Sequence, residues 1–209
     1  APLVAEGKSL YKRNYLSYNS YMRIFTGIKL ADSTKADIER FLKPFKKQAG
    51  PIKWAKTENV HLTLKFIGEA AREKYSQIEE VLTGGDFKVG AFDLEIAGCG
   101  KFGRGNDLNI FWAGIGKNDK LEDLYYRIEN ALAKTGIKKE TRPFKAHITL
   151  GRNKKKYNFN PILLLLDQYA GVPIANFKVE TFQVFKSELF PDGPVYTILK
   201  EITIDDATA

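Results

Sequence analysis

The 209-residue chain is 44% hydrophobic and 28% charged, which is typical of a globular protein and excludes a mainly disordered one. Its longest uninterrupted apolar run, Ile162 to Leu166, is too short to span a bilayer, and one cysteine with two histidines is too few for a disulfide or a His/Cys zinc site. We therefore expect a soluble, cytoplasmic protein without a metal. Its net charge of +8 favours an anionic partner, whether nucleic acid, membrane surface or small phosphate.

Residues 1–21 are polar and rich in tyrosine, and they show neither amphipathic periodicity nor the apolar core of a signal peptide. We interpret them as an extension outside the domain: a leader, an upstream segment or a remnant foreign to the protein. A single domain is expected over residues 22–204, followed by a short tail at 205–209.

Apolar spacing predicts an α+β domain. The expected strands are 23–28, 60–67, 92–97, 109–115, 146–150, 177–185 and 195–204, and the expected helices begin at Ser33, Glu73, Asp119 and Asn160. Ser33 and Asp119 should act as N-caps, and Pro44 should kink the first helix or end it early. The segment Pro191 to Pro194 should form the turn between the last two strands.

A glycine-rich stretch occupies residues 98–105. It is not a P-loop, because it lacks the Gly-Lys-Ser/Thr ending before a helix. Two interpretations stay open: a mobile loop over a groove, or a plain connector.

The chain contains a weak internal repeat. Ile24-Phe25-Thr26-Gly27-Ile28 resembles Ile110-Phe111-Trp112-Ala113-Gly114-Ile115, each is followed by a predicted helix, and both histidines come next, 86 residues apart. The order strand, helix, histidine strand therefore occurs twice. It predicts two similar lobes that each supply one histidine strand.

The two histidines stand in the same tetrapeptide frame, His61-Leu62-Thr63-Leu64 and His147-Ile148-Thr149-Leu150. A single histidine in a strand is more often a structural residue, but two matching frames arise by chance in only about 1 of 10,000 cases. Strand alternation would place His61, Thr63 and Lys65 on one face and turn Val60, Leu62, Leu64 and Phe66 into the core. In the second motif, His147 and Thr149 would share a face, with Ala146, Ile148 and Leu150 inward.

Two imidazoles beside two hydroxyls suit the chemistry of a phosphodiester. One neutral imidazole can act as base while the other, protonated, acts as acid, and the threonine hydroxyls can donate to phosphate oxygens. No metal is needed. The sequence also shows no serine or cysteine in a recognisable nucleophile elbow, which disfavours a covalent intermediate.

The segment Lys134 to Lys156 holds nine basic residues and one acid, Glu140, so the rest of the chain is neutral overall. A solvated surface is the ordinary interpretation of such a run. Because the run surrounds His147, a second interpretation is a cleft rim that contacts RNA phosphates. Lys154, Lys155 and Lys156 could equally point away from the groove.

These residues resemble the two-histidine (2H) phosphoesterase superfamily. The similarity is greatest to its RNA 2′,3′-cyclic phosphodiesterase branch, the LigT-like or ThpR group also called 2′-5′ RNA ligases. The supporting stretches are 22–25, 58–69, 144–152, 187–189 and 193–196. The resemblance covers about residues 22–204 and leaves 1–21 outside.

The resemblance implies a bilobal α+β fold with two pseudo-symmetric antiparallel sheets, helices outside and the active cleft between them. It implies hydrolysis of a terminal RNA 2′,3′-cyclic phosphate to a 2′-phosphomonoester, in RNA processing, by a monomer that needs no cofactor. His61 would be the proton donor and His147 the proton acceptor, while Thr63, Thr149 and Arg152 would bind the substrate, RNA ends or small cyclic nucleotides. The repeat counterpart of Arg152 is Phe66.

Two other functions remain open at this point. One is an ATP-independent 2′-5′ RNA ligase, since ligation is the reverse chemistry at such a bond and no adenylation motif is visible. The other is a nucleotide-binding module that keeps the motifs without turnover.

Overall fold

The computed structural model describes residues 21–48, 50, 52–104, 107–153 and 159–204. Within these ranges no helix is long and apolar enough to cross a membrane. The strands are β1 Tyr21–Lys29, β2 Lys53–Trp54, β3 His61–Ala71, β4 Phe92–Phe102, β5 Ile110–Ile115, β6 His147–Arg152, β7 Pro173–Val179, β8 Thr181–Phe190 and β9 Gly193–Thr203. The helices are α1 Asp32–Gln48, α2 Arg72–Thr83, α3 Asp119–Ala133 and α4 Asn160–Gln168, with a 3-10 turn, η1, at Thr57–Asn59.

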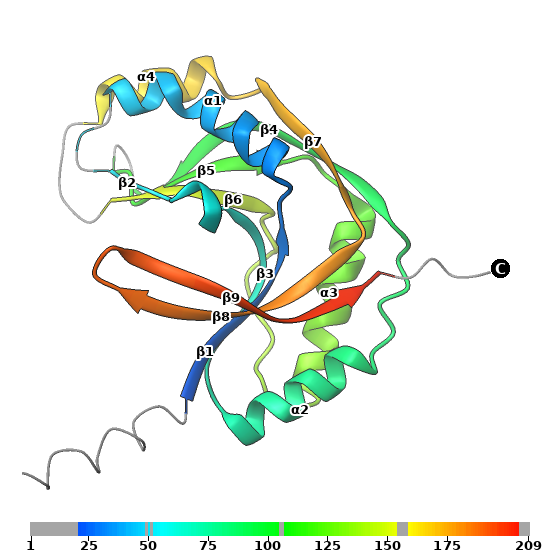
Figure 1. Ribbon diagram of the computed structural model, residues 1–209. Coiled ribbons are helices and arrows are strands. Elements are labelled where there is room, and N and C mark those ends of the chain that lie inside the picture. Colours follow the sequence, from blue (N-terminus) through cyan, green and yellow to red (C-terminus); the bar gives the residue numbers. More distant parts are fainter. Residues whose placement is uncertain (1–20, 49, 51, 105–106, 154–158, 205–209) are drawn as a thin grey trace, which may run out of the picture.

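The strands form an antiparallel sheet that curls into two halves (Figure 1). From the centre outward, one half runs β3-β1-β8-β9 and the other runs β6-β5-β4-β7, with β2 paired to β6. The halves join where Leu62 of β3 pairs with Ile148 of β6. The expected two sheets are therefore two halves of one sheet in the described part of the chain, and the expected α+β fold is confirmed.

The internal repeat appears in this arrangement as a pseudo-two-fold relation. Each histidine strand lies at the centre, next to the strand that opens its repeat, β1 or β5. The resemblance of the two stretches aligns Gly27 with Gly114. This alignment is wrong by two residues, because Lys29 faces His61 whereas Gly114 faces His147. A slip of two residues preserves the face that each side chain occupies, so the repeat still predicts the correct lobes.

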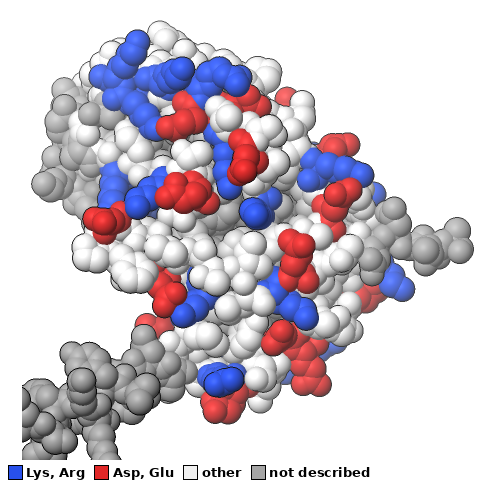
Figure 2. All heavy atoms as spheres, viewed as in Figure 1, with Lys and Arg blue, Asp and Glu red and all other residues white. Residues whose placement is uncertain are grey.

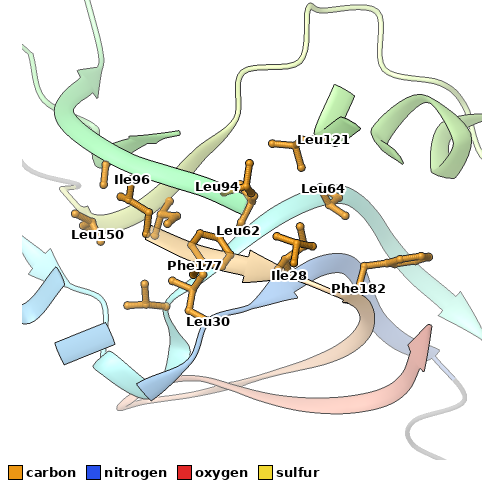
Figure 3. Packing of buried hydrophobic residues seen from close by; sticks show 14 of the residues in the cluster. Ile28, Leu30, Leu62, Leu64, Leu94, Ile96, Leu121, Leu150, Phe177 and Phe182 are labelled. Atoms are coloured by element: carbon orange, nitrogen blue, oxygen red, sulfur yellow. The ribbon is translucent and has the colours of Figure 1, made fainter. Parts of the chain in front are cut away.

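Helices cover one face of the sheet and tie its halves together. Although α1 follows β1, it contacts β7 and α4 of the other half, and although α3 follows β5, it contacts β3 and α2. Buried side chains from both halves and from α3 meet in one core, as Figure 3 shows for Leu62, Leu94, Leu121 and Leu150. The opposite face of the central strands carries the histidines.

Several expected boundaries are wrong. Asn118, not Asp119, caps α3: its side chain accepts a hydrogen bond from the Leu121 backbone N–H. Ser33 lies inside α1, which continues past Pro44 to Gln48 because its apolar face, including Phe45, is fully packed. Burial of the apolar face therefore outweighs the low helix propensity of Pro44.

The expected strand 177–185 is two strands, β7 and β8, which separate at Glu180 and pair with different partners. Most of the glycine-rich stretch belongs to β4, whose residues 99–102 pair with β5, so both interpretations, a mobile loop and a plain connector, are wrong for that part. Gly105 lies outside the described residues. Because β1 begins at Tyr21, it includes the last residue of the predicted extension.

Candidate active site

The two histidine motifs meet at the centre of the sheet. Leu62 and Ile148 pair in antiparallel register, and both side chains are fully buried in the core. Their neighbours point to the other face, where His61, Thr63, His147 and Thr149 are all partly exposed. Because the strands run antiparallel, each imidazole lies on the same side of the Leu62–Ile148 pair as the hydroxyl of the other motif.

Both motif strands then bulge at the same position. On β3, Gly27 pairs with Thr63 and Thr26 with Lys65, so Leu64 is skipped. On β6, Trp112 pairs with Thr149 and Phe111 with Gly151, so Leu150 is skipped. A bulge of one residue inverts the alternation of faces that follows it.

Because of the bulge, the side chains of β3 after Leu64 lie on the faces opposite to those predicted. Lys65, which was expected beside His61, is buried, and Phe66, which was expected in the core, is 62% exposed. The Phe66 ring lies 5.9 Å from that of Phe25, which itself stacks on His61 at 4.8 Å. By the same shift Arg152 follows the buried Gly151 and is exposed. The bulges therefore return Phe66 and Arg152 to the histidine face, one from each repeat.

Both imidazoles are oriented by the same backbone contact. His61 Nδ1 lies 2.7 Å from the carbonyl oxygen of Asn59, and His147 Nδ1 lies 2.7 Å from that of Lys145, in each case two residues earlier. Since a carbonyl can only accept, Nδ1 carries the hydrogen in both rings and Nε2 is left for chemistry. His61 Nε2 lies 3.0 Å from the Thr63 hydroxyl.

The surroundings of the two rings differ. His61 is enclosed by aromatic rings: Phe25 stacks on it, Tyr196 meets it edge-on at 5.1 Å, and Phe185 lies 5.8 Å away. His147 has an edge-on contact with Phe102 at 5.0 Å. A pocket of about 360 Å³ opens beside His61, with Phe185 and Tyr196 in its wall.

This enclosure changes the titration of His61. Burial, the largest cause, lowers its pKa below the ordinary 6.5, the hydrogen bond to Asn59 opposes the shift, and the positive charge of Arg152 lowers the pKa further. The charge of Arg152 also acts on Tyr196, whose pKa burial raises. The Arg152 guanidinium of one half is therefore electrostatically coupled to groups of the other half.

The basic segment is described only in part. Four basic side chains are exposed along the connection that leads to His147: Lys138, Lys139, Arg142 and Lys145. Lys154, Lys155 and Lys156 lie outside the described residues.

On the face drawn in Figure 2, basic and acidic side chains alternate, and Lys and Arg gather over its upper part, where Figure 1 draws α1. That face therefore carries no uniform positive field.

The sequence matches the family described as "LigT like Phosphoesterase" over residues 28–112 and 115–196. The chain belongs to this family. It is 31% identical over 180 residues to an RNA 2′,3′-cyclic phosphodiesterase of Methanocaldococcus jannaschii, covering 86% of this chain and 99% of that protein. It is 32% identical over 180 residues to the protein of the same name from Thermotoga maritima, covering 86% and 94%.

Solved structures share the LigT-like fold. A protein of Thermus thermophilus superimposes with a TM-score of 0.74 at 23% identity, covering 90% of this chain and all of that one. Escherichia coli LigT in complex with 3′-AMP gives 0.70 at 23% identity, covering 88% and 98%.

The sequence did not single out the aromatic side chains around His61, because Phe25, Phe185 and Tyr196 come from three different strands. Phe66 could have been found, since it is the repeat counterpart of Arg152. Among the described residues, no three His, Cys, Asp or Glu side chains converge as metal ligands would.

The lowered pKa of His61 can be measured by an NMR titration, in which two histidines give two sets of imidazole signals. We predict that His61 titrates below 6.5 and that Arg152→Gln raises its pKa, because the substitution removes a charge that disfavours the imidazolium. Arg40→Gln, on α1, is the control and should leave it unchanged. A His61 midpoint at or above 6.5, or no response to Arg152→Gln, would contradict this assignment.

Proposed function

We propose that the protein is a metal-independent RNA 2′,3′-cyclic phosphodiesterase that hydrolyses the terminal cyclic phosphate to a 2′-phosphomonoester. One observation supports this proposal most strongly. The two histidines, each with Nδ1 hydrogen-bonded to a backbone carbonyl two residues earlier, share one face of the central strands with two threonines and Arg152. The alignments with relatives named RNA 2′,3′-cyclic phosphodiesterase cover most of the chain.

In the proposed reaction, His147 Nε2 takes a proton from water as the water oxygen attacks phosphorus. The bond from phosphorus to the ribose 3′-oxygen breaks, and His61 Nε2 gives its proton to that oxygen. The products are a 3′-hydroxyl and a 2′-phosphate, and a proton returns from His147 to His61 through solvent.

Thr63, Thr149 and Arg152 would stabilise the negative charge on the nonbridging oxygens. A hydroxyl can turn its hydrogen toward the oxygen that needs it, and a guanidinium presents several donors in a fixed plane. The charge of Arg152 reaches His61, so a bound phosphate would neutralise it and raise the pKa of the donor. Substrate binding would thus remove one of the two causes that disfavour the protonated form of His61, while burial, the larger cause, remains.

The role of His61 also places the nucleoside. If His61 protonates the leaving 3′-oxygen, the ribose and its base lie on the side of His61. Phe66 borders the ring cluster around His61: it is 62% exposed, and its ring lies 5.9 Å from that of Phe25, which stacks on His61. An exposed ring beside a phosphate site is a stacking platform for a nucleobase, and such stacking contributes about 1–3 kcal/mol per base.

Replacement of either histidine tests the mechanism. His61→Ala and His147→Ala should each lower turnover of a nucleoside 2′,3′-cyclic phosphate at least ~100-fold, and the double variant should lose much less than the product of the two. The bell-shaped pH–rate profile of the wild type should become one-sided. Residual activity should fall with rising pH in His147→Ala, which retains the acid, and rise in His61→Ala.

Near-normal turnover in either single variant would contradict the mechanism. The opposite assignment of the two slopes would show that the acid and base roles are exchanged.

The stacking role of Phe66 can be separated from catalysis. Phe66→Ala should raise KM for a nucleoside 2′,3′-cyclic phosphate about 10-fold, because the lost stacking is worth about 1.4 kcal/mol, with little change in kcat. Phe66→Trp keeps a ring and should retain the wild-type KM. An abasic ribose 2′,3′-cyclic phosphate is the matched substrate control, and an equal effect of Phe66→Ala on it would show that the ring does not act on the base.

A further inference from the structure

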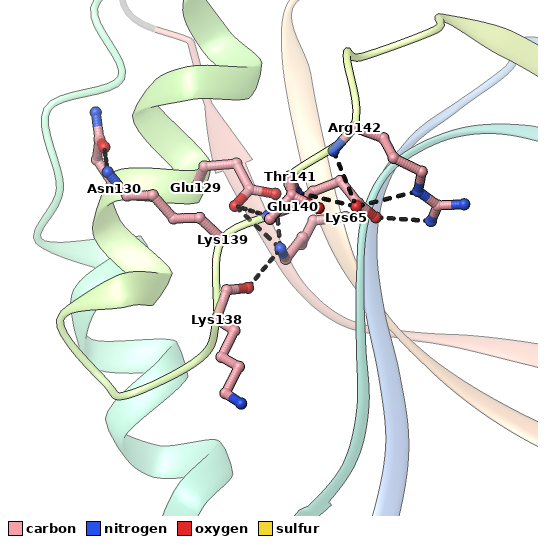
Figure 4. A network of polar contacts seen from close by, with 8 residues as sticks. All are labelled: Lys65, Glu129, Asn130, Lys138, Lys139, Glu140, Thr141 and Arg142. Carbon is pink, nitrogen blue, oxygen red and sulfur yellow. Dashed lines mark hydrogen bonds and ion pairs between the residues drawn. The ribbon is translucent and has the colours of Figure 1, made fainter.

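A buried ion pair lies directly behind the candidate site. Lys65 Nζ is 2.7 Å and 3.0 Å from the two carboxylate oxygens of Glu129 on α3, and the two side chains are only 9% and 5% exposed. The Leu64 bulge turns Lys65 to this side of β3, two residues after Thr63. Figure 4 shows the pair at the centre of a network of polar contacts.

The pair also holds the backbone of the connection between α3 and β6. Lys65 Nζ donates to the carbonyl oxygen of Lys138 at 2.8 Å, and the Glu140 backbone N–H donates to the Glu129 carboxylate at 3.1 Å (Figure 4). The same connection ends at Lys145, whose carbonyl orients His147 Nδ1. Lys65 and Glu129 thus tie the strand of His61 to the connection that orients His147 through the carbonyl of Lys145.

Fold stability alone is a weak explanation for such a pair. Taking two charges out of water is costly, and replacing a buried ion pair by apolar side chains of similar volume is often neutral or stabilising. The anchoring contacts are directional, in contrast, since an ammonium must face a carbonyl and a carboxylate must face an N–H. They fix the path of the backbone more sharply than apolar packing does.

Resting on the function proposed above, we propose that Lys65 and Glu129 are positioning residues that set the place of His147 relative to His61. They touch no substrate and act through the 138–145 connection. A misplacement of about 1 Å in a catalytic group can cost about 100-fold in rate, so a pair that fixes this connection acts on turnover even where it adds nothing to stability.

The test is the double variant Lys65→Met/Glu129→Leu, which replaces the pair by apolar side chains. Its resistance to urea should equal or exceed that of the wild type. Its kcat on a nucleoside 2′,3′-cyclic phosphate should fall about 10- to 100-fold with KM nearly unchanged. Wild-type kcat in a folded double variant would overturn the proposal.

A double-mutant cycle distinguishes positioning from a merely structural effect. In the His147→Ala background, the Lys65→Met/Glu129→Leu substitutions should lower the residual activity less than about 2-fold, because the group through which they act is gone. An equal loss in both backgrounds would overturn the proposal. Lys138→Gln is the control in the same connection: the Lys138 side chain is exposed and its backbone carbonyl is retained, so kcat should not change.

A measurement that needs no turnover separates this inference from the proposed function. In imidazole NMR, the Nδ1–H of His147 should exchange faster with water in the double variant, while the His61 signals stay in place. Glu129→Gln is a milder variant that keeps the size of the side chain, and it should show the same effect at smaller size. Unchanged His147 signals in both variants would overturn the inference, whereas a wild type without turnover would overturn the proposed function alone.

Discussion

The pairing of Leu62 with Ile148 is the contact on which the candidate site depends. Each residue stands between the histidine and the threonine of its own motif, so burying both side chains in the shared core turns all four polar side chains to the opposite face. The two halves of the sheet meet at this pair, and the pseudo-two-fold relation passes through it. Loosening the core at this point would therefore separate the two motifs.

The faces of the four motif side chains could be predicted from the sequence, because strand alternation and burial of Leu62 and Ile148 both follow from apolar patterning. The lobes could be predicted from the repeat. The faces of Lys65 and Phe66 could not, since alternation assumes an unbroken period of two and a bulge adds a residue without any pattern of its own. The break between β7 and β8 was missed for a similar reason: apolar side chains continue across Glu180 while the pairing partner changes.

The two repeats have the same arrangement of strands but differ in the side chains that they bring to the candidate site. The same bulge delivers an arginine from one half and a phenylalanine from the other. The arginine suits an anionic phosphate, and the phenylalanine suits a base. Two rings held by identical backbone contacts differ in their surroundings, because Phe25, Phe185 and Tyr196 enclose His61 whereas Phe102 meets His147 edge-on. Unequal histidines are what a reaction with one acid and one base requires.

The proposed activity is tested most directly by incubating an RNA oligonucleotide that ends in a 2′,3′-cyclic phosphate with the protein in excess chelator. Phosphorus NMR identifies the position of the phosphate in the product. We predict complete conversion to the 2′-phosphomonoester at an undiminished rate in chelator. A 3′-phosphate would contradict the proposed leaving oxygen. Binding without turnover, or activity that returns only with a divalent ion, would contradict metal-free catalysis by the two histidines.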